Sequence, residues 1–395
     1  MSNANKPMFS SLTLPPLSLY IHIPWCVRKC PYCDFNSHVS NEKNTLDEPR
    51  YIEALKRDID AEKKWRQGRK LQSIFFGGGT PSLFSADSIA DILAYAEKNL
   101  GFASDIEITL EANPGTFEQE KFSGFYQAGV NRLSIGIQSF NPQHLQTLGR
   151  IHNSDEAKRA VGIAQQAGFN NINLDLMHGL PQQTIDNAND DLQTAIDFAP
   201  QHISWYQLTI EPNTQFYRQP PPLPADDTLA DIQYHGSQLL ATNGFQQYEI
   251  SAFSQAGQQS THNRHYWEFG DYIGIGAGAH GKFTDIDQQR IIRRQKTRLP
   301  EHYLDYQQYP KAKETIVDTN ELALEFMMNA LRLTEGVPID YFSQRTGLSV
   351  DSIKAPLQQL HQQGLLDAHT EKLTTTEFGQ RFLNTVLEKF NTDIS

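Results

Sequence analysis

A regular alternation of short β-branched or aromatic runs with longer helical patterns constrains the fold most, and it extends from about residue 17 to residue 242. Six strand-and-helix units in strict alternation predict an α/β fold with a parallel sheet and right-handed crossovers. An open doubly wound sheet and a full or partial barrel both satisfy this pattern, because the order of the strands is not visible in the sequence. The strands are expected at 18–23, 71–76, 105–111, 130–137, 170–176 and 202–208, and the helices at 50–65, 86–100, 117–128, 154–167 and 184–198.

The pattern changes along the 395 residues, which is a length typical of about two or three domains. Residues 1–16 are polar and contain proline, without the basic start and apolar run of a signal peptide, so we expect a flexible tail. Residues 17–242 form the predicted barrel, and residues 243–315 are less regular and are expected to connect or cover it. Residues 316–395 contain three helical patterns, a short hairpin and a final helix, which predicts a winged-helix-like α+β module.

The charge balance limits the partners that we expect. The chain has 34 basic and 46 acidic side chains, for a net charge of −12, which argues against a broad surface for nucleic acid. Residues 316–395 hold six Lys or Arg and eleven Asp or Glu, so we expect them to serve structure or docking rather than DNA binding. No stretch approaches the roughly 18 to 20 apolar residues that span a bilayer. Peripheral membrane contact and dimerisation are left open.

The three cysteines of the chain lie together, just after the first expected strand, as Cys26, Cys30 and Cys33. An odd and clustered set cannot form a disulfide framework, so we expect a reduced, cytoplasmic protein whose thiols bind a metal. Zinc would need a fourth ligand, which His38 could supply. An iron–sulfur cubane on three cysteines would leave one iron open for a small molecule. Aromatic residues in the same loop favour the cubane, because apolar groups shield a cluster from water.

Glycine and polar residues follow the ends of the other expected strands. Since functional residues of a parallel barrel gather where its strands end, we expect these residues to share one site. Carboxylates suit ribose hydroxyls, a guanidinium suits a ligand carboxylate, and glycines allow a ligand to approach the backbone. A single such residue is more often a solvated loop group, but several at one rim favour a binding site. They are Gly78, Gly79, Thr80, Glu111, Gln138, Arg150 and Asp175.

The cysteine spacing C-x3-C-x2-C, followed one strand later by Gly-Gly-Gly-Thr-Pro, resembles the radical S-adenosylmethionine (SAM) superfamily. The resemblance implies a partial (β/α)6 barrel and a [4Fe-4S] cluster whose open iron binds SAM. Over almost the whole chain, the strand-end residues together with Tyr20 resemble the oxygen-independent coproporphyrinogen III oxidase family. The resemblance implies that Cys26, Cys30 and Cys33 bind the cluster, and that SAM is bound by Tyr20, Gly78, Gly79, Thr80, Glu111, Gln138, Arg150 and Asp175.

Two departures separate the chain from the oxidases of that family. Phe35 stands where the oxidases have a fourth cysteine, and only about sixteen residues precede the first expected strand. Both features match the branch of heme chaperones known as HemW. The run His-Asn-Arg-His-Tyr-Trp at residues 262–267 resembles the HNxxYW motif that is tied to heme in that branch, with His262 as the first candidate ligand and His265 as the second. Without the resemblance, a hydrogen-bonded lid is the simpler interpretation of this motif.

These resemblances imply a cytoplasmic heme chaperone that binds a [4Fe-4S] cluster, SAM and heme, and delivers heme to a hemoprotein. The alternative is an oxygen-independent coproporphyrinogen III dehydrogenase. Whether the chain acts as an enzyme, whether SAM is cleaved and which protein accepts heme are left open by the sequence. A basic run within residues 290–298 is typical of a solvated face, with heme propionates or lipid head groups as alternative partners.

Overall fold

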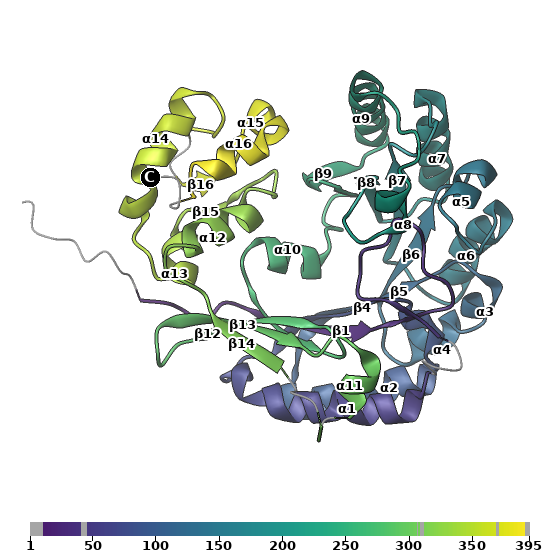
Figure 1. Ribbon diagram of the computed structural model, residues 1–395, viewed down its shortest axis with the longest axis horizontal. Coiled ribbons are helices and arrows are strands. Elements are labelled where there is room, and N and C mark those ends of the chain that lie inside the picture. Colours follow the sequence, from purple (N-terminus) through teal and green to yellow (C-terminus); the bar gives the residue numbers. More distant parts are fainter. Residues whose placement is uncertain (1–10, 41–45, 306, 309–311, 369–370, 392–395) are drawn as a thin grey trace, which may run out of the picture.

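The computed structural model describes residues 11–40, 46–305, 307–308, 312–368 and 371–391. All six expected strands are present and lie side by side in parallel, in chain order (Figure 1). Because the order never doubles back, the sheet is barrel-like rather than doubly wound, and the predicted partial α/β barrel is confirmed. The strands are β1 (Leu17–Ile23), β4 (Leu71–Gly78), β5 (Phe102–Ala112), β6 (Arg132–Gln138), β7 (Ile172–His178) and β8 (His202–Gln207).

The sheet continues beyond these six strands at both edges. The segment 243–315, expected to connect or cover the barrel, supplies strands to both sides. Next to β1 lie β11 (Asp271–Ile275), which is parallel to it, and then the antiparallel strands β12 (His280–Asp285), β13 (Arg290–Lys296) and β14 (Ala312–Ile316). Next to β8 lie β10 (Ala252–Ser254) and β9 (Gln246–Glu249). From the same segment, α10 (Thr261–Trp267) packs against β4.

Helices cover the outer face of the barrel strands (Figure 1). The helix expected at 117–128 is divided in two, and the helix expected at 154–167 has Asn153 as its N-cap, which forms a capping box with Glu156. Thr184 is the N-cap of the helix expected at 184–198. The helices are α1 (Glu48–Glu62), η1 (Lys63–Arg66), η2 (Pro81–Leu83), α2 (Ala86–Leu100), α3 (Thr116–Gln119), α4 (Phe122–Gln127), α5 (Pro142–Thr147), α6 (Ser154–Gln166), α7 (Ile185–Asp197), α8 (Gln215–Arg218), α9 (Asp226–Thr242) and α11 (Pro300–Leu304).

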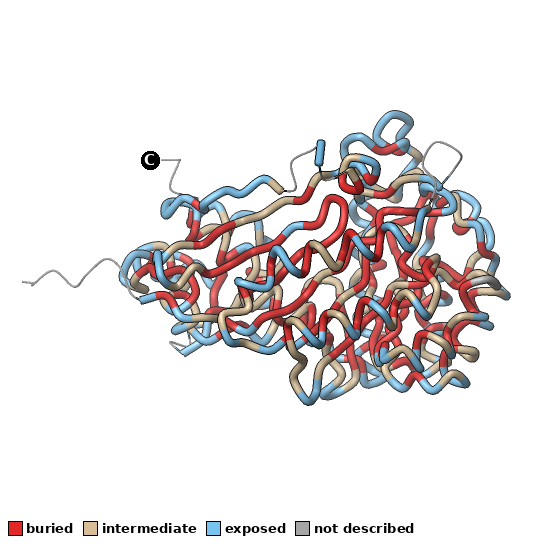
Figure 2. The backbone as a smooth tube through the Cα atoms, turned by 90° about the horizontal axis from the view of Figure 1, so that it is seen from below, coloured by how far each residue is buried: buried red, intermediate tan, exposed pale blue. Residues whose placement is uncertain are grey.

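The main core lies between the sheet and these helices, and the buried backbone follows the strands through the molecule (Figure 2). Leu19 and Ile21 on β1, Phe76 on β4 and Leu174 on β7 have no exposed surface. Each such side chain contributes roughly 1.5–3 kcal/mol when it leaves water. This burial fixes the register of the strands, and the register in turn places the ends of the strands at one rim.

The C-terminal region has the expected helices, but its strand pairing differs from the prediction. The hairpin expected at 365–374 is reduced to one antiparallel bridge, between Leu366 and Thr375, with the Asp367 N–H donating to Thr374 O at 3.0 Å. An unexpected pair joins β15 and β16, which are far apart in sequence, and the final helix is divided in two. Residues 369–370 lie outside the described part. The core of this region is continuous with Tyr248 and Phe269 of the sheet region. The elements are α12 (Leu322–Ala330), β15 (Val337–Pro338), α13 (Asp340–Thr346), η3 (Val350–Ile353), α14 (Lys354–Gln362), β16 (Lys372–Leu373), α15 (Glu377–Arg381) and α16 (Leu383–Glu388).

Of the tail expected at 1–16, residues 1–10 lie outside the described part, and the remainder is packed against the molecule. Leu12 is 4% exposed, and its backbone N–H donates to Gln289 Oε1 at 2.8 Å. The Thr13 N–H donates to the carbonyl oxygen of Gln344 at 2.8 Å. These contacts tie residues 11–16 to both the sheet and the C-terminal region. Within the described residues, no helix has the length and apolar character to cross a membrane.

Candidate functional site

The cysteine loop follows β1 directly and is closed by a short parallel pair, β2 (Trp25–Cys26) with β3 (His38–Val39). Inside the loop, the Cys33 N–H donates to the carbonyl oxygen of Cys30 at 3.2 Å. Cys26 is buried, whereas Cys30 and Cys33 are half-buried. The loop therefore turns its three thiols toward one side, at the rim where the parallel strands end.

The three thiols line a cavity of about 150 Å³, which we call the cysteine cavity. Most of the predicted SAM residues come to it from β4, β5, β6 and β7 or from the turns that follow them, and Arg150 comes from the turn after α5. Tyr206 on β8 also lines this cavity, and the sequence reasoning missed it although it lies near the end of the sixth expected strand. Of the predicted residues, those lining the cavity are Cys26, Cys30, Cys33, Gly78, Gly79, Thr80, Glu111, Gln138, Arg150 and Asp175.

The glycines after β4 are required by the close approach of two segments of the chain. The Gly79 N–H donates to Ile23 O and the Thr80 N–H donates to Trp25 O, both at 2.7 Å, so the ladder between β4 and β1 continues into the cysteine loop. A Cβ on Gly79 would lie 2.5 Å from Trp25 O. Gly78 has a φ of +114°, which favours glycine. The turn at residues 78–80 therefore fixes the cysteine loop through backbone hydrogen bonds, and its glycines place no side chain in the cysteine cavity.

Two acidic side chains lie on this cavity. Glu111 Oε2 accepts a hydrogen bond from the Gly78 N–H at 3.3 Å, and burial together with the nearby Asp175 raises the pKa of Glu111 to about 8. Glu111 is therefore mostly protonated at neutral pH and can donate a hydrogen bond. Asp175 accepts hydrogen bonds from Ser134 Oγ and Asn173 Nδ2, each at 2.9 Å. Both groups suit the recognition of ligand hydroxyls.

Arg150 lies beside the cysteines and is fixed by the strand ends. Its Nη2 donates to Asn113 Oδ1 at 2.7 Å and to Gly136 O at 2.8 Å, and its Nη1 lies 3.6 Å from Cys30 Sγ. The Arg150 Nε is buried without a hydrogen-bond partner among the described residues. Gln138, with a φ of +70°, accepts a hydrogen bond from the Tyr206 hydroxyl at 2.6 Å. The donor set is thus arranged before any ligand is present.

The arrangement does not match a Cys3His zinc site. His38 does not line the cysteine cavity, and its Nε2 lies 3.3 Å from Asn36 Oδ1. Within the described ranges, no three His, Cys, Asp or Glu side chains are gathered around a single point as metal ligands. Three thiols around a common cavity fit a cubane better, because each cysteine then binds a different iron.

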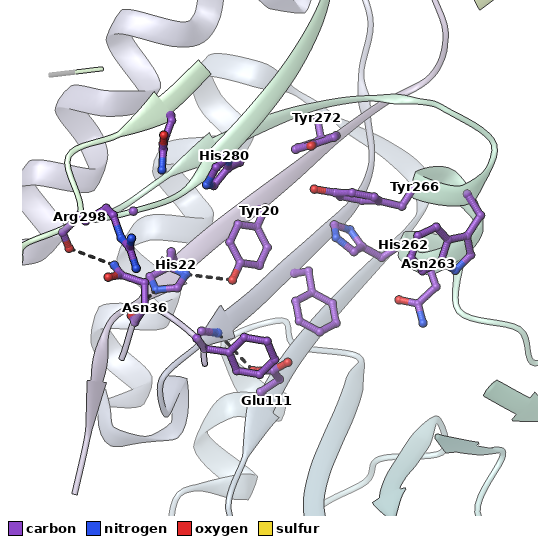
Figure 3. A pocket seen from close by; sticks show the side chains of 16 residues that line it. Tyr20, His22, Asn36, Glu111, His262, Asn263, Tyr266, Tyr272, His280 and Arg298 are labelled. Atoms are coloured by element: carbon purple, nitrogen blue, oxygen red, sulfur yellow. Dashed lines mark hydrogen bonds between the residues drawn. The ribbon is translucent and has the colours of Figure 1, made fainter. Parts of the chain in front are cut away.

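A second and larger cavity of about 850 Å³ adjoins the first, and we call it the aromatic cavity. It shares Phe35, Gly78 and Glu111 with the cysteine cavity. Tyr20 lines this second cavity only, where its hydroxyl lies 3.0 Å from His22 Nδ1 and its ring stacks on Phe75. It is the one predicted SAM residue that lies outside the cysteine cavity. Aromatic and imidazole rings dominate the lining, from Tyr20, His22, Phe35, Phe75, His262, Tyr266, Trp267, Tyr272 and His280 (Figure 3).

His262 reaches this cavity from α10. Its backbone N–H donates to Glu107 Oε1 at 2.9 Å, its Nδ1 lies 2.9 Å from Ser73 Oγ, and its ring stacks on Phe75. Burial, with smaller effects of His265 and Arg132, lowers the pKa of His262 to about 3. The imidazole is therefore neutral at physiological pH, and its Nε2 has no hydrogen-bond partner in the described part of the chain. A neutral imidazole with one nitrogen free is suited to bind a metal.

His265, the second candidate in the motif, has a different environment. Its Nε2 donates to the Asp271 carbonyl oxygen at 2.7 Å, and it does not line the aromatic cavity. Burial lowers the pKa of His265 to about 4. A Cβ on Gly270 would lie 2.3 Å from this ring, so the histidine is enclosed by its own chain. His265 therefore joins α10 to β11, and His262 is the motif histidine available to a ligand.

Comparisons with known proteins agree with this architecture. Residues 20–195 match the radical SAM superfamily, and residues 317–382 match the HemN C-terminal domain. The chain is 53% identical to the heme chaperone HemW of Haemophilus influenzae over 96% of this chain and 99% of the relative, and 49% identical to that of Escherichia coli over 95% and 98%. The solved structure of coproporphyrinogen III oxidase (HemN) from Escherichia coli matches with a TM-score of 0.80 at 22% identity, over 96% of this chain and 91% of that one.

Proposed function

The chain belongs to the HemW-type branch of the radical SAM superfamily, and on that premise we propose that it is a heme chaperone. In this proposal it carries a [4Fe-4S] cluster, SAM and heme, and it delivers heme to a hemoprotein in the cytoplasm. Curated relatives named heme chaperone HemW support this function, since they match the chain over nearly its whole length. The proposal includes neither nucleic acid as a partner nor a requirement for a membrane.

The cysteine cavity suits the cluster and SAM. Cys26, Cys30 and Cys33 would hold three irons, which leaves the fourth open to the amino and carboxylate groups of SAM. The Arg150 guanidinium, whose Nη1 lies beside Cys30, suits a carboxylate, and Glu111 and Asp175 suit ribose hydroxyls. A reduced cluster supplies the electron with which radical SAM proteins cleave SAM. The residues of this chain bind and orient SAM at the cluster, whether or not cleavage follows.

The observation that carries the heme proposal is the neutral imidazole of His262 on a large cavity lined with rings. If the His262 Nδ1–H donates to Ser73 Oγ, the lone pair of Nε2 faces the ligand. The rings of Tyr266 and Trp267 offer flat apolar surface for a macrocycle. His262 therefore has the role of iron ligand, and Ser73 fixes its tautomer and orientation.

Hemin binding tests this proposal. The chain mixed with hemin should elute from gel filtration with a Soret band, and His262→Ala should weaken the band and shift its maximum. The matched control is His235→Ala, since His235 is exposed on α9 and lies outside the cavity. Retention of no heme by the wild-type chain would rule out the chaperone function, and an unchanged spectrum in His262→Ala would rule out the ligand.

The second candidate function is oxygen-independent coproporphyrinogen III dehydrogenase. It is favoured by the contact of the two cavities at Gly78 and Glu111, because SAM at the cluster would lie near a porphyrinogen in the aromatic cavity. Phe35, in the position of the fourth cysteine of the oxidases, argues against it. Anaerobic incubation with coproporphyrinogen III, SAM and a reductant should yield no protoporphyrinogen, and sustained turnover would replace the chaperone by the enzyme.

A further inference from the structure

The aromatic cavity has two unlike ends (Figure 3). His262 and Asn263 lie at one end, and Arg298 and His280 lie at the other, with Tyr20 between them. The first end is bounded by rings of α10 and by Phe75. The second end is polar, and both Arg298 and His280 are exposed there. The cavity therefore fits a ligand with an apolar body and a polar edge.

The basic run within residues 290–298 is mostly used by the chain itself. Four of its five cationic side chains form ion pairs with nearby carboxylates, so they do not form a free basic face. The pairs are Arg290 with Asp285 at 3.1 Å, Arg293 with Glu325 at 2.6 Å, Arg294 with Glu62 at 2.6 Å, and Lys296 with Asp58 at 2.8 Å and Glu62 at 2.7 Å.

Arg298 is the exception in this run. Its backbone carbonyl oxygen accepts a hydrogen bond from Asn36 Nδ2 at 2.9 Å, which fixes the backbone at the mouth of the cavity. Its guanidinium has neither an ion pair nor a hydrogen bond to any residue that the structure describes, although it lines the aromatic cavity. Each of the other four cations in the run lies next to a carboxylate that neutralises its charge. No carboxylate among the described residues neutralises the Arg298 charge, which is therefore available to a ligand of the cavity.

We propose that Arg298, next to His280, is the carboxylate-binding end of the aromatic cavity and holds heme by its propionate groups. This inference rests on the proposed heme function and adds the orientation of the ligand. An arginine fork binds a carboxylate through two parallel hydrogen bonds. Burying the propionates at the ring-lined end would leave charges without partners, which is strongly unfavourable. The macrocycle then extends from Arg298 toward His262, with its propionates at the exposed mouth.

Hemin and hemin dimethyl ester distinguish this role from a general effect on the cavity, because the ester lacks the propionate charges. Dissociation constants are measured by Soret titration of the full chain for both ligands, in the wild type and in Arg298→Gln. Hemin should bind about tenfold more weakly to Arg298→Gln, whereas the ester should bind both proteins equally within about twofold. Arg290→Gln is the matched control, since Arg290 belongs to the same run but is paired with Asp285 and lies outside the cavity.

The outcomes separate this inference from the function on which it rests. Equal weakening of hemin and its ester in Arg298→Gln, or no weakening of hemin, would overturn the role of Arg298 while leaving heme binding intact. A wild-type chain that binds neither ligand would contradict the heme function and the Arg298 role together. A thermal melt shows whether each variant is folded. Arg298→Gln should have the melting temperature of the wild type, because the Arg298 side chain is exposed and has no partner among the described residues.

Discussion

In the cysteine cavity most polar side chains are hydrogen-bonded to one another, whereas two polar groups of the aromatic cavity, His262 Nε2 and the Arg298 guanidinium, have no partner among the described residues. Arg150 donates hydrogen bonds to Asn113 and Gly136, and Asp175 accepts them from Ser134 on the neighbouring strand and Asn173 on its own strand. Among the described residues, neither His262 Nε2 nor the Arg298 guanidinium has any such bond. A prearranged set suits cofactors that stay, and a wide cavity with free groups suits a ligand that enters and leaves. This difference is consistent with the proposal that the cysteine cavity holds cofactors and the aromatic cavity holds heme as cargo.

The largest expected effect is the loss of iron from the cysteine cavity alone. After anaerobic reconstitution, Cys30→Ala should hold close to no iron, compared with about four irons per wild-type chain, because a cubane needs all three thiolates. Hemin affinity should stay within about threefold, since no cysteine lines the aromatic cavity. Val27→Ala, an exposed change in the same loop, is the control. Joint loss of iron and hemin binding would show that the cavities are one site.

The second effect should be confined to the aromatic cavity. Ser73→Ala removes the hydroxyl beside His262 Nδ1 and should lower hemin affinity by about 10- to 100-fold, as is usual for groups that orient a metal ligand. Iron per chain should not change. Ser18 Oγ lies 2.7 Å from Ser73 Oγ and contacts the histidine only through it, so Ser18→Ala should lower hemin affinity less. Wild-type affinity in Ser73→Ala would remove the orienting role of the serine.

The buried environment of His265 should be detectable in a pH experiment. The pKa of His265 is lowered to about 4 in the folded chain, so between pH 6.5 and 4 the unfolded chain binds the extra proton and folding stability falls as the pH falls. At pH 5, protonation of His265 in the unfolded chain lowers the free energy of unfolding by about 2 kcal/mol. Urea unfolding at pH 7 and pH 5 should therefore show a pH-dependent loss of stability that is about 2 kcal/mol smaller in His265→Gln. Equal losses in both proteins would contradict this environment for His265.

The smallest effect is expected at the wall that the cavities share. Phe35 lines both cavities and is 63% exposed, so Phe35→Ala should change the free energy of unfolding by less than about 0.5 kcal/mol. Hemin affinity should fall by only about twofold, and iron should remain at about four per chain. If Phe35→Ala changed both hemin affinity and iron per chain more than tenfold, Phe35 would couple the two cavities rather than border them.

The cysteine cavity could be predicted from the sequence because its residues follow consecutive strands. Once six parallel strands are recognised, Gly78, Glu111, Gln138 and Asp175 must come to one rim, whatever the details of packing. The only residue of the predicted set placed differently is Tyr20, which points to the neighbouring cavity. The alternation of strands and helices was sufficient for this prediction, because the six parallel strands lie in the sheet in the same order as in the chain.

The aromatic cavity could be predicted only in part. The motif at residues 262–267 identified His262, but nothing local indicated that β11 pairs with β1, the pairing that brings His280 and Arg298 to the same cavity. Pairing between segments some 250 residues apart is set by packing and register, which a sequence pattern does not contain. The same limit explains the missed pair of β15 with β16. Arg298 and Arg290 belong to the same basic run of the sequence. They differ in the structure because Arg290 is paired with the carboxylate of Asp285, whereas Arg298 has no such pair among the described residues.

One sample tests the separation of the two cavities most directly. The wild-type chain is reconstituted anaerobically, loaded with hemin and passed through gel filtration, and non-heme iron and heme are counted on the same fractions. Two distinct cavities predict about four non-heme irons and about one heme per chain at the same time. Heme that binds only as the cluster iron is lost would contradict separate sites for cofactor and cargo.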